Sequence, residues 1–238
     1  MEIWRYLATT AAEAETADLP PGFGMAYMAC HFSPYGTGLS NIPQTLPEGS
    51  MLILNDRTPI RGHDGLHILN QLEKARQQLG FGSLLLDFQR PDNPETASLC
   101  RILTGQLSCP VGIAQGYALE GEGAVFLAPP PLDQPLAAYL APWHGRELWL
   151  DIAPQCQCIT VTESGSASEL LPFSSPPEDA FTDEGLHCRY RAEVLESEIR
   201  FTLWRDLPLA EKLLREGKVL GIRKAIGLYQ EYFCLGSR

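Results

Sequence analysis

The sequence predicts an α/β protein that folds as a single (β/α)8 (TIM)-type barrel over residues 1–238, irregular or incomplete in places, with a late β-hairpin. Three observations support this class. Short apolar runs bounded by Gly, Pro and Asp alternate with segments of helical spacing. Seven or eight such runs occur, which fits a barrel better than a doubly wound open sheet. A length of 238 residues also suffices for one large core without disulfides or metals.

The first half of the chain alternates strand and helix. We expect buried strands at residues 22–32, 51–55 and 83–88, and helices at 64–79 and 95–107. Asp64 can cap the first of these helices and Gly80 can end it. Parallel strands joined by helices explain this order best.

The second half continues the pattern less regularly. We expect strands at 111–115, 124–128, 147–151 and 222–229, and helices at 135–144 and 208–216. Residues 186–194 and 199–205 alternate polar and apolar side chains on both sides of a short polar turn, which predicts the hairpin. Residues 164–185 are rich in Ser, Pro, Glu and Asp and predict a long exposed loop.

Composition excludes several classes of function. The balance of 18 basic and 29 acidic residues, net −11, disfavours nucleic acid and anionic membrane surfaces as partners. No apolar run approaches the roughly 18 residues of a membrane span, and the amino terminus lacks a signal-peptide pattern. The seven cysteines are an odd number and lie mostly in apolar runs. We therefore expect a cytoplasmic protein with reduced thiols and no cofactor.

Polar side chains follow several predicted strands at the point where each strand ends. In a parallel barrel these ends meet at one rim, where ligands bind. The residues placed there are Asp56, Arg57, Asp87, Gln89, Gln115, Tyr117 and Asp151. A single Asp at a strand end often serves only to start a loop. Asp87 differs, because it follows three leucines and is expected to be partly buried.

The segment Gly82-Ser-Leu-Leu-Leu-Asp-Phe-Gln89 resembles the fourth-strand signature of glycoside hydrolase family 18, which ends in Asp-aromatic-Glu. On that pattern Asp87 matches the last Asp and Phe88 the aromatic residue. Gln89 stands where the acid Glu belongs, and Gly82 and Leu85 replace two earlier acids. A second similarity is the late order of a strand pair, Trp204, a helix and a final strand led by glycine, as in chitinase-like and spore-associated members.

This resemblance implies a (β/α)8 barrel that binds an oligosaccharide of N-acetylated sugars. In the family the Glu protonates the glycosidic oxygen, and the preceding Asp orients the 2-acetamido group that attacks the anomeric carbon. A carboxamide cannot donate that proton, so Gln89 would keep hydrogen bonding to a sugar and lose general acid catalysis, about 10² to 10⁴-fold in rate. The departure favours a carbohydrate-binding or weakly active protein.

Aromatic rings are the other requirement of a sugar site, because the C–H faces of sugars stack on them. Tyr35, Trp204 and Tyr229 are the aromatic candidates for substrate binding. Trp149 lies within a Leu-Trp-Leu strand and is expected to pack in the core.

Two alternatives stay open. A hydrolase of another barrel class would use Asp56, Asp87 and Asp151 as a carboxylate cluster, with or without a divalent metal. A noncatalytic interaction protein would present the acidic segment 164–184 to a partner.

Overall fold

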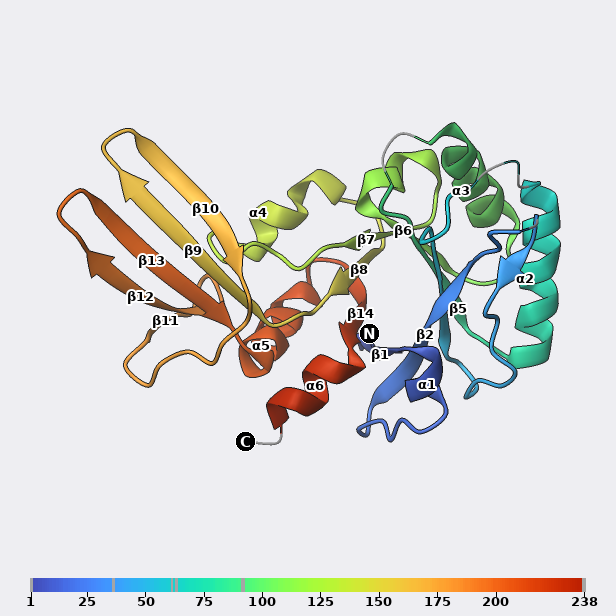
Figure 1. Ribbon diagram of the computed structural model, residues 1–238, viewed down its shortest axis with the longest axis horizontal. Coiled ribbons are helices and arrows are strands. Elements are labelled where there is room, and N and C mark those ends of the chain that lie inside the picture. The colour runs from blue at the N-terminus through green and yellow to red at the C-terminus, as the bar shows by residue number, and fades with distance from the viewer. Residues whose placement is uncertain (1, 36, 61, 63, 91–92, 237–238) are drawn as a thin grey trace.

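Eight parallel strands close into a barrel in the computed structural model, which describes residues 2–35, 37–60, 62, 64–90 and 93–236, the last four by their backbone alone. Neighbouring strands pair in the order β1-β14-β8-β7-β6-β5-β4-β2, and β1 pairs with β2 to close the ring. The short strand β3 (Leu39–Ser40) adds antiparallel to β2. The predicted (β/α)8-type barrel is therefore confirmed (Figure 1).

The barrel strands are β1 (Trp4–Thr9), β2 (Phe23–Phe32), β4 (Met51–Asn55), β5 (Ser83–Asp87), β6 (Val111–Ala114), β7 (Ala124–Leu127), β8 (Leu148–Asp151) and β14 (Ile222–Leu228). All but β1 coincide with a strand predicted from the sequence. The strand β1 was missed, because its segment Trp-Arg-Tyr-Leu-Ala-Thr mixes a charged residue into a short apolar run.

The helices are α1 (Ala11–Ala14), α2 (Gly65–Leu79), α3 (Pro94–Gln106), α4 (Leu136–Leu140), α5 (Leu207–Gly217) and α6 (Tyr229–Gly236), with 3-10 turns η1 (Gln115–Glu120) and η2 (Ala141–Trp143). Their ends follow the predicted signals. The Asp64 carboxylate accepts from the Leu66 amide, and Asp206 accepts from the Leu209 amide. Gly80 ends α2 with φ of 70°, a left-handed conformation that favours glycine.

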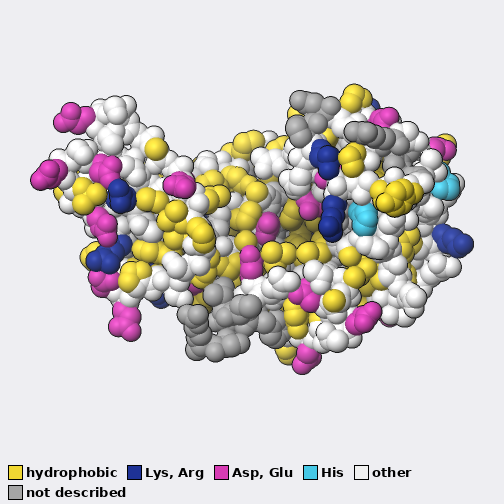
Figure 2. Space-filling view, viewed as in Figure 1, with side chains coloured by type: hydrophobic (Ala, Val, Ile, Leu, Met, Phe, Trp, Pro, Cys, Tyr) yellow, Lys and Arg dark blue, Asp and Glu magenta, His cyan; other side chains and the backbone are white. Residues whose placement is uncertain are grey.

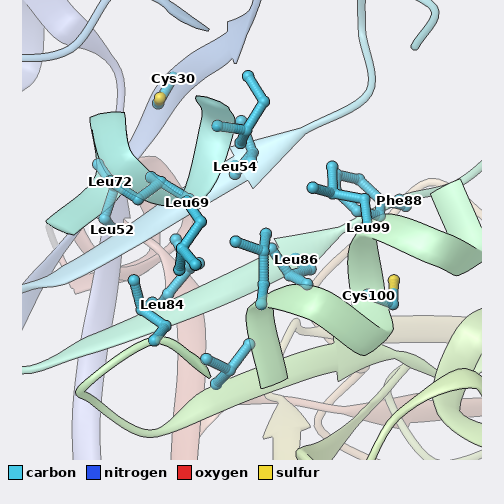
Figure 3. Packing of buried hydrophobic residues seen from close by; sticks show 14 of the residues in the cluster. Cys30, Leu52, Leu54, Leu69, Leu72, Leu84, Leu86, Phe88, Leu99 and Cys100 are labelled. Atoms are coloured by element: carbon cyan, nitrogen blue, oxygen red, sulfur yellow. The ribbon is translucent and has the colours of Figure 1, made fainter. Parts of the chain in front are cut away.

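Two layers of apolar side chains hold the barrel in shape. Figure 3 shows the outer layer, where leucines of β4 and β5 pack against α2 and α3. Inside the ring, the fully buried Trp149 fills the space that Gly112 leaves, since a Cβ at Gly112 would lie 2.3 Å from the indole. Trp149 thus packs in the core, as predicted.

A separate antiparallel sheet is inserted between β8 and α5 and extends away from the barrel (Figure 1). Its strands are β9 (Gln155–Thr162), β10 (Gly165–Leu171), β11 (Phe181–Asp183), β12 (Cys188–Val194) and β13 (Glu198–Arg205), in the order β10-β9-β13-β12-β11. The hairpin β12–β13 confirms the late hairpin of the prediction. The loop predicted at 164–185 is wrong in part, because β10 and β11 lie within it.

This sheet was underestimated because its strands carry no strong periodic signal. Every residue of β10 is exposed, so its Ser, Ala and Glu side chains resemble those of a loop. Backbone pairing with β9 nevertheless orders the segment from Gly165 to Leu171. The buried Arg205 ties the base of the sheet to the barrel by donating to the carbonyl oxygen of Pro130 (2.6 Å), and it also donates to the carbonyl oxygen of Leu186 within the inserted sheet (2.9 Å).

No helix among the described residues is long and apolar enough to cross a membrane. The six cysteines whose side chains the structure describes are free thiols.

Candidate functional site

A cavity of about 1360 Å³ opens at the carboxyl ends of the barrel strands. All eight strands or the turns directly after them contribute to its wall, from Ala8 at the end of β1 to Leu228 at the end of β14. Figure 2 shows acidic side chains in the middle of the molecule, between the antiparallel sheet and the barrel helices, with basic side chains beside them. The cavity thus lies at the carboxyl end of the barrel, which is the end at which parallel barrels bind ligands.

The cavity brings together the strand-end residues that the sequence singled out. Its lining includes Asp56, Arg57, Asp87, Gln89, Gln115, Tyr117 and Asp151. They come from β4, β5, β6 and β8 or the turns that follow these strands, so residues far apart in the sequence share one wall.

The three aromatic candidates lie outside the cavity lining. Tyr35 is 98% exposed in the turn between β2 and β3. Trp204 is buried in the antiparallel sheet, where its indole N–H donates to Ser174 Oγ at 3.4 Å. Tyr229 begins α6, one residue beyond the last lining residue of β14. The rings that do line the cavity are Phe88, Tyr117 and Phe126.

Asp87 and Gln89 form a hydrogen-bonded pair at the end of β5. The Gln89 side-chain amide donates to Asp87 Oδ1 in a short contact. Burial raises the pKa of Asp87 above its usual range; the bond from Gln89 lowers it, and the nearby charge of Asp56 raises it. The amide therefore offsets part of the cost of keeping this carboxylate charged.

Asp151 is another acid on the cavity wall, at the end of β8. Burial is the main cause that raises the pKa of Asp151 to about 7; the charges of Glu231 and Asp87 act in the same direction, and the backbone amides of Ala153 and Ile152 act against them. Asp151 can therefore hold or release a proton near neutral pH.

Asp56 has a different position, because its carboxylate is engaged by backbone. Its oxygens accept from the Gln89 amide at 3.1 Å and from the Arg90 amide at 2.8 Å. Asp56 is buried, and these bonds fix the turn that carries Gln89. We assign it a positioning role, which is the loop role that the sequence left open.

Arg90 and Tyr117 extend this network along the rim. The Arg90 guanidinium donates through Nε to the Asp56 carbonyl (2.9 Å) and through Nη2 to the Arg57 carbonyl (3.0 Å). The Tyr117 hydroxyl donates to the Arg90 carbonyl in a short contact and accepts from the Asn93 amide at 3.3 Å. Tyr117 thus supports the turn with its hydroxyl and contributes its ring to the wall.

Sequence reasoning missed several lining residues, namely Asn55, Arg90, Asn93, Glu120 and Phe126. Asn55 could have been found, because it is the polar last residue of the apolar run that forms β4. In the structure its side chain donates to the Met28 carbonyl at 2.9 Å. Arg90 and Asn93 follow β5, and no local pattern in the sequence predicts that they line the cavity.

The metal-dependent alternative finds no donor set in the part of the chain that the structure describes. There, no group of three or more His, Cys, Asp or Glu side chains could hold a metal ion. The carboxylate of Asp56 is already engaged by two backbone amides.

Comparison with known proteins supports the fold. No model of a protein family matches the chain, and no curated protein matches it in sequence. The spore cortex-lytic enzyme SleL of Bacillus cereus has a TM-score of 0.53 at 10% identity, covering 94% of this chain and 70% of that one.

Two further solved structures are similar to the chain. The candidate sporulation-specific glycosylase YdhD of Bacillus subtilis gives a TM-score of 0.52 at 8% identity, covering 84% of this chain and 88% of that one. The C-terminal domain of a chitinase candidate from Desulfitobacterium hafniense DCB-2 gives 0.54 at 9% identity, covering 94% and 92%. At such identities the likeness shows a shared barrel fold.

Proposed function

We propose that this protein is a glycoside hydrolase-like barrel that binds an oligosaccharide of N-acetylated sugars with little or no hydrolysis. The observation that carries the proposal is the Asp87–Gln89 pair, which lines a large cavity at the carboxyl end of β5, the fourth barrel strand along the chain. That is the strand on which the resemblance to family 18 placed the pair. The solved structures of similar fold, named as cortex-lytic and glycosylase proteins, support the same class.

The side chains of the wall suit a sugar. Asp87, Gln89, Gln115, Asn55 and Asn93 offer carboxylate and amide groups that can accept from or donate to hydroxyl and acetamido groups. Phe126 and Tyr117 provide ring surface in the same wall. A cavity of about 1360 Å³ exceeds the usual range for small-molecule sites, so it has room for more than one sugar ring.

Gln89 decides between binding and hydrolysis. In a retaining glycosidase of this type a carboxylic acid protonates the leaving oxygen, and a carboxamide has no proton of comparable acidity to give. Gln89 can still donate to Asp87 and to a bound sugar. The proposed role is therefore recognition of a glycan.

The test compares the native chain with Gln89→Glu. Both are assayed on fluorogenic N-acetylglucosamine oligomers and by thermal shift with unlabelled oligomers of the same sugar. We expect a concentration-dependent rise in Tm for the native chain with little hydrolysis, and at least tenfold faster hydrolysis for Gln89→Glu. Gln157→Glu would be a poor control because Gln157 is buried, so Gln78→Glu on helix α2 is used instead, because Gln78 is exposed and does not line the cavity.

Absence of binding and of hydrolysis in both forms would overturn the carbohydrate proposal. If the native chain binds the oligomers but Gln89→Glu gains no hydrolysis, the proposed glycan ligand stands. The proposal that the amide at residue 89 is what prevents hydrolysis would then be refuted.

A second candidate function is favoured by Asp151. Asp87 and Asp151 both line the cavity, and the pKa of Asp151 is raised to about 7. Most glycosidases use a pair of carboxyl groups of this kind, one of which donates a proton. In this version Asp151 supplies the proton that Gln89 cannot, and the protein is a slow hydrolase. Activity of the native chain that is abolished by Asp151→Asn, with sugar binding retained, would support it.

A further inference from the structure

The inserted antiparallel sheet has two faces of opposite character. Residues directly opposite each other in an antiparallel pair point to the same face, so the strand register assigns each side chain to a face. On one side, the apolar face, the three outer rows hold no charged residue. These rows are Leu170, Gln157, Leu203, Tyr190 and Phe181; then Ser168, Ile159, Phe201 and Ala192; then Ser166, Val161, Ile199 and Val194. The other face carries Glu169, Arg191, Glu193, Glu198 and Arg200, as a solvated sheet face does.

Much of the apolar face is exposed. Its base is covered, because Leu203 packs with Leu132 from the loop before α4. Toward the edges and the tip, Leu170 is 69%, Phe181 64% and Val194 80% exposed. The sheet extends away from the barrel (Figure 1), and the residues of its outer rows do not line the cavity. A contiguous exposed apolar surface of this kind marks a site of interaction.

Two polar side chains in the middle of the apolar face, Gln157 and Ser168, are engaged within the protein. The Gln157 carboxamide accepts from the Leu132 amide at 3.1 Å and donates to Ser168 Oγ at 2.6 Å. Because these groups already have partners, covering them with another apolar surface costs little. A sugar, by contrast, needs free donors and acceptors for its hydroxyl groups. The face therefore suits an apolar partner better than a glycan.

The distribution of charge favours a second copy of the chain as that partner. The chain carries a net charge of −11, so two copies repel each other at a distance, and salt screens this repulsion. Contact through the apolar face adds no pair of like charges at close range, because the outer rows of this face hold no charged residue. A partner recognised by its charge would find no ion-pair partner there.

The size of the apolar face matches a weak dimer. Its five strands, spaced about 4.8 Å apart, and its three rows, spaced about 6.8 Å apart, cover about 500 Å² on each copy. Two copies then bury roughly 1000 Å² in total, which is the lower limit for a specific interface. Two sheets can stack face to face in this way at a spacing of about 10 Å.

We infer that the apolar face packs against the same face of a second copy, so that the two inserted sheets form a sandwich and the protein is a two-fold dimer. The residues of this interface lie outside the cavity lining. The dimer therefore does not depend on the proposed binding of a glycan, and the two can be tested separately.

Sedimentation equilibrium of the full chain at micromolar concentrations, in low and in high salt, tests the dimer. The native chain should show a reversible monomer–dimer equilibrium that shifts toward the dimer as salt rises. Leu170→Glu and Val194→Lys should each weaken dimerisation at least tenfold, because a two-fold interface contains each residue twice. The two variants change the net charge in opposite directions, so a shared loss would come from the apolar contact.

Ala167→Glu is the matched control for Leu170→Glu. Ala167 is exposed on the same strand, β10, and the register places it on the charged face opposite Thr160. It should leave the dimerisation constant unchanged. Because Leu170 and Val194 are largely exposed, their variants are expected to fold as monomers, and circular dichroism and titration with an N-acetylglucosamine tetramer check this.

Other outcomes would overturn the inference. A native chain that stays monomeric at every concentration and salt would leave the apolar face to a different protein. A dimer that Leu170→Glu leaves intact, or that Ala167→Glu weakens equally, would have its interface elsewhere. A tenfold loss of affinity for the N-acetylglucosamine tetramer in folded Leu170→Glu would make the face part of a glycan site. Failure of the native chain to bind the tetramer would remove the proposed function and leave the dimer standing.

Discussion

The side-chain amide of Gln89 donates a hydrogen bond to the carboxylate of Asp87, and both side chains line the same cavity. The two residues are separated by one position, so they point to one side of the strand end. This relationship makes Asp87 a half-buried carboxylate whose pKa is raised by burial and partly lowered again by the bond from Gln89.

Replacing Gln89 by Glu should destabilise the protein at neutral pH. The substitution turns a donor beside Asp87 into a second carboxylate, and two like charges in contact cost on the order of 1–3 kcal/mol. The cost should vanish near pH 4, where the pair shares a proton. Urea unfolding of both forms at pH 4.5 and pH 8 measures it; an equal free energy of unfolding at pH 8 would contradict the observed contact.

Asp56→Ala should lower stability and weaken ligand binding together. The Gln89 and Arg90 amides would lose their bonds to the buried Asp56 carboxylate, and hydrogen bonds to a charged group are worth roughly 1.5–3 kcal/mol each. Asp56→Asn keeps one acceptor oxygen and should cost less. Chemical denaturation gives the stability of both variants, and titration with the N-acetylated tetramer gives the affinity. A stable Asp56→Ala protein that binds normally would refute the positioning role.

Much of the fold could be predicted because it depends on local signals. Apolar runs such as Ser83–Asp87, the caps Asp64 and Asp206, and the stop at Gly80 each leave a mark within a few residues. The mixed strand β1 and the exposed strand β10 leave no such mark. The order of β1 comes from pairing with β14, which is distant in the sequence, and the order of β10 comes from backbone pairing with β9, the strand directly before it. Helix α6 begins at Tyr229, where the prediction extended the last strand by one residue.

The residues of the site also fall into those that a local signal predicts and those that it does not. Strand ends locate Asp87, Asp151 and Gln115, because parallel strands gather their ends at one rim. The contact of Arg90 with Arg57 joins two turns that are 33 residues apart, and no spacing rule contains it. The cytoplasmic location and the single-domain organisation stay predictions.

Gly112→Ala should destabilise the barrel strongly. A Cβ at that position would lie 2.3 Å from the indole of Trp149, which is fully buried inside the barrel. Overpacking of this kind costs about 1–3 kcal/mol or more. Gly105→Ala is the matched control, because nothing lies within 4 Å of its Cβ in helix α3 and alanine favours a helix by up to about 1 kcal/mol. Opposite shifts in Tm are expected, and equal shifts would contradict the packing.

Asp151→Asn should change the pH dependence of stability in a defined direction. The folded protein raises the pKa of Asp151 from 3.8 to about 7, so the folded state holds a proton that the unfolded chain releases between those pH values. The free energy of unfolding of the native chain therefore falls as pH rises from about 4 to about 7, and levels off above that. Asparagine removes this loss, which amounts to at most roughly 4 kcal/mol. Urea unfolding should show equal stability of both forms near pH 4 and a more stable variant at pH 8, whereas the exposed control Glu163→Gln should follow the native curve. A variant less stable than the native chain at pH 8 would mean that charged Asp151 is stabilised by partners, and it would end its role as a neutral-pH acid.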